Sequence, residues 1–151
     1  MDEIETILAL SALHETETSP LTRQKLTQML GEAFYSASAD SGRDGYLISF
    51  DQDAHYDSVN FLWFKTRYPR FVYIDRVVVA AHARGRGIAR GFYEALFDQA
   101  RAAGHDYVVC EINLAPANPG SFAFHNALGF VEVGQADLGP AKRVSYQAFT
   151  L

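Results

Sequence analysis

Cysteine is almost absent from this chain, because Cys110 is the only one among 151 residues. A single cysteine excludes an internal disulfide and is typical of a protein from a reducing compartment. Long apolar runs are also absent, since none approaches the roughly 18 residues of a membrane span. The acidic start Met1–Glu5 lacks the basic region of a signal peptide. These absences predict a cytoplasmic protein without a membrane partner.

An excess of positive charge is the third absence. The chain carries 13 Lys and Arg against 18 Asp and Glu, a formal net charge of −5. A general nucleic-acid binder would have a basic surface, so we expect no nucleic-acid partner. The length suits one domain that spans residues 1–151 and buries a sizeable core.

Hydrophobic periodicity, caps and turn residues predict an α/β protein. The region 71–114 reads as a strand, a helix and a second strand, a crossover unit whose two strands run parallel. Ser19-Pro20 reads as the cap of the first helix, and Asp57 or Ser58 as the cap of the second. We predict strands at 7–13, 34–39, 45–50, 71–79, 107–114, 130–133 and 144–149, and helices at 21–30, 57–68, 87–103 and 118–128.

The most informative stretch joins the strand at 71–79 to the helix at 87–103. A β-branched run ends in a turn rich in Gly and Arg, and an amphipathic helix follows at once. In such a turn, several backbone N–H groups converge on one point in front of the helix N-terminus. That end of a helix already favours anions. We therefore expect a phosphate or pyrophosphate here. The stretch reads Val77-Val78-Val79-Ala80-Ala81-His82-Ala83-Arg84-Gly85-Arg86-Gly87-Ile88-Ala89-Arg90.

Two well-known phosphate motifs do not fit this stretch. A Walker loop needs Lys-Ser or Lys-Thr after its glycines, and neither is present. A dinucleotide fingerprint that starts at Gly85 would need Gly or Ala where the chain has Arg90. What the stretch does match is the pattern R-x-x-G-x-A, as Arg84, Gly87 and Ala89.

A second motif follows one strand later. Asn118 and Pro119 read as the cap and first residue of a helix, and Ser121 stands three residues after Asn118. Leu128-Gly129-Phe130 closes the segment. Together the two motifs resemble the acetyl-CoA-dependent GNAT superfamily of N-acetyltransferases, closely over 71–130 and elsewhere only in the order of elements.

This resemblance implies a mixed, mostly antiparallel central sheet flanked by helices, in which a splayed pair of parallel strands binds acyl-CoA. It also implies the reaction: an amine attacks the thioester of acetyl-CoA directly. The loop Arg84–Arg90 would hold the pyrophosphate, and the strand edge at Val77–Val79 would hold the pantetheine arm. The full set of cofactor residues is Val77, Val78, Val79, Arg84, Gly85, Arg86, Gly87, Ile88, Ala89, Arg90, Asn118, Ser121, Phe124 and His125.

The family's chemistry needs an oxyanion donor, a base and an acid, and the resemblance makes the Val79 backbone N–H the donor. For the base we expect Glu111, because a glutamate within the strand 107–114 is out of place unless it faces a cleft. A solvent-facing Glu111 is the alternative. Asp75 is the second candidate, unless it only pairs with an arginine.

His125 stands where the family usually has the tyrosine that protonates the departing thiolate. Three roles stay open for it: an acid, a base, or a contact to CoA without a proton role.

Other residues of the chain are weaker candidates for a functional role. Cys110 has the parity of a buried structural thiol, and we expect the three histidines His14, His82 and His105 on the surface or in loops. No His, Cys and Asp cluster has the spacing of a metal site. The aromatic stretch with His55, Tyr56, Asp57, Asn60, Trp63 and Tyr68 is compatible with an acceptor pocket, with ordinary packing, or with a homodimer contact.

The acceptor itself stays open at this stage, as either a small-molecule amine or a peptide amine. The alternative function is a non-catalytic acyl-CoA-binding or sensing module, which the His125 substitution keeps open. A carboxylate at 111 or 75 in the same cleft as His125 would count against it. A nucleotide-binding protein would need a base- and ribose-binding half that the sequence lacks.

Overall fold

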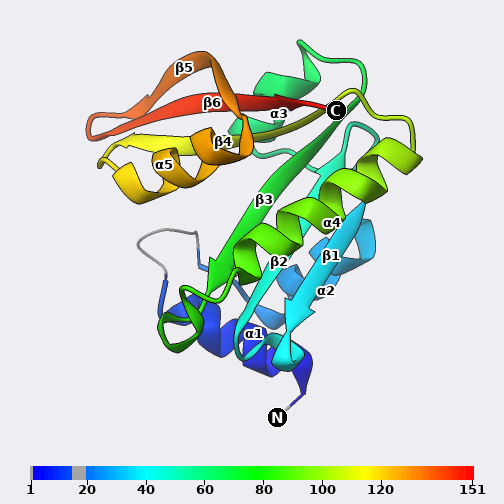
Figure 1. Ribbon diagram of the computed structural model, residues 1–151, viewed down its shortest axis with the longest axis vertical. Helices are drawn as coiled ribbons and strands as arrows, with labels where there is room; N and C mark the ends of the chain where they lie inside the picture. The colour runs from blue at the N-terminus through cyan, green and yellow to red at the C-terminus, as the bar shows by residue number, and fades with distance from the viewer. Residues whose placement is uncertain (1, 15–19) are drawn as a thin grey trace.

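A six-stranded sheet organises the computed structural model, which describes residues 2–14 and 20–151. Its strand order is β1-β2-β3-β4-β6-β5, and every neighbouring pair is antiparallel except β3 with β4 (Figure 1). The predicted mixed, mostly antiparallel sheet with one parallel pair is confirmed. The strands are β1 (Tyr35–Ala39), β2 (Gly45–Asp51), β3 (Phe71–Val79), β4 (Tyr107–Ala115), β5 (Val131–Gly139) and β6 (Lys142–Thr150).

Helices cover both faces of the sheet. One face packs against the long helix α4 and against α5, through a core that includes Leu96, Val108 and Phe130. The other face packs against α1, α2 and α3, through a core that includes Phe64 and Tyr146. Within the described part of the chain, no helix has the length and apolarity that a membrane crossing requires. The helices are α1 (Glu3–Ala12), α2 (Arg23–Glu32), α3 (Val59–Lys65), α4 (Ile88–Ala102) and α5 (Pro119–Leu128).

The first element corrects our prediction, because the expected strand at 7–13 is the helix α1. The Asp2 carboxylate caps this helix by accepting a hydrogen bond of 2.8 Å from the Glu5 backbone N–H. Its buried residues Ile7, Leu10 and Ser11 have the spacing of one helix face. A short apolar run such as Ile7–Leu10 fits either period, and here the cap decides between them.

The second helix starts later than predicted. Ser19, the expected cap, lies outside the described residues. The structure instead caps α2 with Thr22, whose hydroxyl accepts a hydrogen bond of 3.1 Å from the Lys25 backbone N–H. The helix continues through Gly31 to Glu32, whereas the sequence predicted an end at Gly31.

Most of the remaining predicted elements are confirmed. β3 spans the predicted residues, Ser58 caps α3, and Asn118 caps α5. The last hairpin is longer than predicted, because β5 extends to Gly139 and β6 begins at Lys142. Most β5 side chains are exposed or partly exposed, so the apolar pattern that marks a buried strand is weak there.

The parallel pair separates soon after it begins. β3 and β4 are in register only from Phe71 to Tyr73 and from Tyr107 to Val109. A β-bulge on β3 follows directly, since Ser49 of β2 faces Ile74 while Ile48 faces Arg76, so that Asp75 is the extra residue. Beyond this point the two strands diverge and leave a gap between their edges. The predicted splayed pair is therefore present in the fold.

Replacing Gly45 by Ala tests the close approach between β2 and β3. A Cβ at this position would lie 2.6 Å from the Val78 carbonyl oxygen. We expect Gly45→Ala to lower the free energy of unfolding by about 1–3 kcal/mol, the usual cost of overpacking. Urea denaturation measures the change, and a variant as stable as the parent protein would contradict the close approach.

Gly31→Ala in α2 is the matched control. A Cβ there would meet nothing within 4 Å. We expect this second variant to raise the free energy of unfolding by about 0.5–1 kcal/mol, because alanine favours the helix more than glycine does.

Candidate active site

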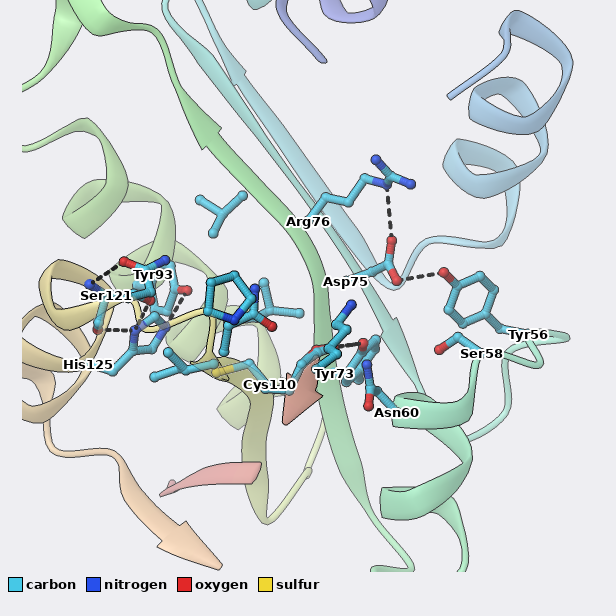
Figure 2. Close-up of a pocket in the computed structure, with 18 residues that line it drawn as sticks. Tyr56, Ser58, Asn60, Tyr73, Asp75, Arg76, Tyr93, Cys110, Ser121 and His125 are labelled. Atoms are coloured by element: carbon cyan, nitrogen blue, oxygen red, sulfur yellow. Dashed lines mark hydrogen bonds and ion pairs between the residues drawn. The ribbon is translucent and has the colours of Figure 1, made fainter. Parts of the chain in front are cut away.

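A cavity of about 480 Å³ occupies the gap between the diverging strands β3 and β4. Figure 2 shows two groups of polar side chains on opposite sides of it, one around His125 and one around Asp75, with Tyr73 and Cys110 between them. The cavity thus receives side chains from both strands and from the helices on either side. Its lining residues are Tyr56, Ser58, Asn60, Tyr73, Ile74, Asp75, Arg76, Val77, Tyr93, Cys110, Glu111, Ile112, Asn113, Pro116, Asn118, Ser121, His125 and Lys142.

Glu111 on β4 shares this cavity with a tyrosine from β3. The Tyr73 hydroxyl donates a hydrogen bond to Oε1 of Glu111, and it lies 3.1 Å from Oε2. Burial raises the pKa of Glu111 to about 7, with a smaller upward contribution from the negative charge of Asp75. The hydrogen bond from Tyr73 acts in the opposite direction. A carboxyl group with this pKa is half ionised near neutral pH, as a general base requires.

Asp75 projects from the β-bulge, where the extra residue changes which side chains face the cavity. Tyr56 donates a hydrogen bond of 2.6 Å to its Oδ1, and Arg76 Nε lies 3.4 Å from its Oδ2 (Figure 2). Burial raises the pKa of Asp75, while Tyr56 and Arg76 lower it. Both carboxylates proposed from the sequence therefore lie in one cavity, and Asp75 also forms the arginine contact considered as its alternative.

His125 lies in the same cavity with both ring nitrogens engaged. Nδ1 lies 2.7 Å from the Ser121 carbonyl oxygen, which can only accept, so we assign the proton to Nδ1. Burial lowers the pKa of His125, so the ring is neutral and Nε2 accepts the 2.8 Å hydrogen bond from Tyr93 of α4 (Figure 2). This network ties α5 to α4.

The helix that carries His125 begins close to the cavity because of local sequence. The Asn118 side chain accepts a hydrogen bond of 3.2 Å from the Ser121 backbone N–H, and Pro119 fills the first helical position. Both Asn118 and Ser121 line the cavity. Phe124 lies outside the lining and packs against the Tyr93 ring at 5.1 Å.

The loop rich in Gly and Arg lies between the end of β3 and α4. Gly85 and Gly87 adopt φ of 79° and 77°, and a Cβ at either would meet nothing within 4 Å. The left-handed backbone, rather than a lack of space, therefore explains these glycines. Gly87 is the N-cap of α4 and provides no side chain for the first N–H groups of that helix.

Asp44, in the turn between β1 and β2, anchors this loop. Its carbonyl oxygen accepts a hydrogen bond of 2.9 Å from the Ala80 backbone N–H. Its carboxylate lies 2.8 Å from His82 Nε2 and 3.9 Å from Arg86 Nη1. Arg90 pairs with Glu94 along α4 at 2.9 Å. Arg84 is exposed.

The backbone of β3 presents N–H groups to the gap. Because Ala80 donates toward β2, and successive N–H groups of a strand point to alternate sides, those of Val77 and Val79 point toward β4. Beyond Tyr73, β4 is no longer paired with β3. The Val78 side chain lies in the core, outside the cavity lining.

The aromatic stretch before β3 divides between cavity and core. Tyr56 and Asn60 line the cavity, whereas Trp63 stacks on Tyr146 at 4.2 Å and Tyr68 packs edge-on against Tyr107. His55 and Asp57 are exposed.

The histidine predictions are confirmed in part. His14 and His105 lie in connecting segments, as predicted, but they are buried there, and His105 packs edge-on against Phe34. His82 is exposed as predicted. Cys110 is buried as predicted, and burial raises the pKa of its thiol, which disfavours the thiolate.

Sequence analysis did not identify Tyr73, Tyr93 or Lys142 as residues of the site. The parity of β3 would have placed Tyr73 on the face of Phe71, but the pairing with Glu111 depends on the register between β3 and β4. Lys142 was missed because the predicted last strand began at residue 144. The bulge at Asp75 leaves no signature in the sequence.

A strand pair that opens around a buried carboxylate, with a loop rich in Gly and Arg at its end, is the arrangement that the resemblance implied. In agreement, the Acetyltransferase (GNAT) family model matches residues 10–130. The chain therefore belongs to the GNAT acetyltransferase family.

Comparisons with individual proteins agree with this family. The L-2,4-diaminobutyric acid acetyltransferase of Wolinella succinogenes is 29% identical over 90 residues, covering 58% of this chain and 52% of that protein. The chain thus spans about half the length of this curated relative.

Solved structures share the fold. The ribosomal-protein-alanine N-acetyltransferase of Brucella melitensis has a TM-score of 0.70 at 19% identity, with 99% of this chain and 94% of that chain covered. An aminoglycoside 6′-N-acetyltransferase complexed with coenzyme A has a TM-score of 0.72 at 13% identity, with 97% and 89% covered. At these identities the likeness concerns the fold alone.

The raised pKa of Glu111 has a consequence for stability. The folded pKa of about 7 exceeds the ordinary 4.5, so ionising Glu111 destabilises the fold as the pH rises between these values. We expect Glu111→Gln to increase the free energy of unfolding at pH 8 by on the order of 2 kcal/mol, with the gain disappearing below about pH 4. Urea denaturation at both pH values measures it.

Glu94→Gln is the control for this measurement, because Glu94 is an exposed carboxylate on α4. We expect little change in stability at either pH. Equal effects of the two substitutions at pH 8 would show that Glu111 carries no special burial cost.

Proposed function

We propose that this protein transfers an acetyl group from acetyl-CoA to a primary amine, by direct attack of the amine on the thioester. The observation that carries the proposal is Glu111, a carboxylate with a pKa of about 7 in the cavity between the diverging strands. A base with this pKa can accept the proton of an attacking amine at neutral pH.

The cofactor would lie along β3 and end at the loop Arg84–Arg90. Left-handed Gly85 and Gly87 and the start of α4 support a pyrophosphate there, with Arg84 exposed beside it. The Val79 N–H would bind the pantetheine arm in the gap, and the Val77 N–H would face the thioester end. Asn118, Ser121 and His125 would line the other side of the arm, while Val78 and Phe124 would support it from the core. Coenzyme A in the related aminoglycoside 6′-N-acetyltransferase is consistent with this choice of cofactor.

Each step of the transfer has a candidate group. The amine nitrogen forms a bond to the thioester carbon, a backbone N–H at the open edge of β3 stabilises the oxyanion, and Glu111 takes the amine proton. Val77 lines the cavity together with Glu111 and is the better placed donor, whereas the expected donor Val79 lies outside the lining. The C–S bond then breaks and CoA leaves as a thiolate, whose pKa near 8.5 makes it a moderate leaving group. His125, neutral and bonded at both nitrogens, is better suited to shaping the thioester end of the cavity than to donating a proton.

The position of the two carboxylates argues against the non-catalytic alternative. A binding module needs no carboxylate facing the cofactor's reactive end, yet Glu111 and Asp75 both line the cavity that contains His125. The diaminobutyrate acetyltransferase relative supports a small amine acceptor over a peptide for this chain. A cytoplasmic location and a homodimer stay predictions.

The pyrophosphate assignment is tested by Arg84→Ala. A lost charged hydrogen bond costs about 1.5–3 kcal/mol, so we expect a roughly 10- to 100-fold weaker affinity for acetyl-CoA by calorimetric titration. Arg101→Ala, at the far end of α4, is the control and should leave the affinity unchanged. Unchanged affinity in the Arg84 variant would remove that residue from the site. Titration with NAD should show no binding.

The base assignment is tested by the pH dependence of kcat/KM. Only ionised Glu111 can accept a proton, so activity should rise with pH through about 7. We expect Glu111→Gln to lower kcat by roughly 10²- to 10⁴-fold and to abolish this limb. Glu94→Gln should preserve both rate and limb. A normal limb in the Glu111 variant would assign the titration to another group.

A further inference from the structure

Charged groups of both signs line the cavity, and they are not equally engaged. Asp75 accepts a hydrogen bond from Tyr56 and lies against Arg76, so one anion and one cation of the cavity are already in contact. Glu111 is held by the uncharged hydroxyl of Tyr73. Lys142 is the other cation in the lining. Among residues 2–14 and 20–151, no carboxylate oxygen lies within ion-pairing distance of Lys142 Nζ.

Lys142 lies near Glu111 without contacting it. It begins β6, and alternation along the strand places it on the same face as Val144 and Tyr146. Tyr146 is the register partner of Glu111 across the β4–β6 ladder. The positive charge of Lys142 also lowers the pKa of Glu111, although burial dominates that pKa. An ammonium group therefore stands at the cavity a short distance from the base.

A neutral donor is available in the same cavity. The Tyr146 hydroxyl donates a hydrogen bond of 2.8 Å to Oδ1 of Asn60. This contact uses one lone pair of the amide oxygen, and the Nδ2 hydrogens can donate to a ligand. Asn60 and Lys142 both line the cavity, so both can offer donors there.

We infer that the acceptor is a small zwitterion whose carboxylate binds Lys142, with Asn60 as a second donor, while its amine faces Glu111. This inference rests on the proposed acetyl transfer. A polyamine would bring a second positive charge toward Lys142, and Asp75 is already in contact with Arg76. A peptide N-terminus carries no carboxylate next to its amine. An amino acid with a free amine satisfies both ends of the cavity.

Matched acceptors that differ only by a carboxylate test the inference. The pairs are ornithine with putrescine, and 2,4-diaminobutyrate with 1,3-diaminopropane, together with a peptide that has a free N-terminus. We expect kcat/KM at least about tenfold higher for each amino acid than for its decarboxylated partner, the size of one charged contact. In Lys142→Met, KM for the amino acids should rise about tenfold with kcat nearly unchanged. KM for the diamines should stay the same or fall, because the variant removes a like charge.

Two further variants complete the design. Lys142→Arg should keep the preference for the amino acids. Arg143→Met, at the neighbouring residue that pairs with Asp137 outside the cavity, should leave all values unchanged.

The possible failures are distinguishable. Preference for the diamines or the peptide, or an equal loss for both members of a pair in Lys142→Met, overturns the inference and leaves acetyl transfer intact. If the protein binds acetyl-CoA but acetylates none of the acceptors, the proposed function is overturned, and the inference with it.

Discussion

β3 and β4 pair for only three residues each, and the rest of the site depends on that limit. A strand that loses a neighbour exposes a row of unpaired backbone groups on that side, and it must be held from the other side. Here each strand keeps its other neighbour: β3 stays paired with β2 to Val79, and β4 stays paired with β6 to Ala115, each across one register shift. The sheet can therefore open along one seam while both strands remain fixed. The opening provides the cavity and a row of backbone donors beside it.

The way in which the carboxylates are buried sets their chemistry. Glu111 and Asp75 each accept a hydrogen bond from a phenol, from Tyr73 and Tyr56 respectively. A phenol satisfies an oxygen of the carboxylate without neutralising its charge, whereas a bidentate arginine would lower the pKa strongly. Glu111 therefore keeps the proton affinity that burial confers. Neutral partners at a buried acid are what a base requires, and a structural ion pair would lack them.

Strong local signals made part of this structure predictable. Phe71–Val79 is β-branched and aromatic, and Asn118-Pro119 marks a helix start, so both elements follow from neighbouring residues alone. The run Ile7–Leu10 fits two periods, and the exposed strand β5 has a weak apolar pattern, so α1 and the length of the last hairpin did not follow.

The site was predictable where a local pattern decided it: the parity of one strand for Glu111, and the helix motif for Asn118, Ser121 and His125. Glu111 could be placed in a cleft because the residues directly before and after it on β4 are apolar and face the core, so that Glu111 faces the opposite side. Its contact with Tyr73 depends on register between strands, and the orientation of Asp75 depends on a bulge that the pairing with β2 creates. Placing Lys142 at the site required knowing that β6 begins at this residue. Interactions between distant residues produce these features, and no short segment encodes them.

Asp44 orders the loop between β3 and α4 before any ligand is present. Through its backbone carbonyl and its carboxylate, one residue of the β1–β2 turn contacts Ala80, His82 and Arg86. The conformational entropy of these residues is therefore lost when the chain folds, and a cofactor that arrives later does not lose it again. The proposed pyrophosphate site would therefore need no rearrangement of these three residues before a ligand binds.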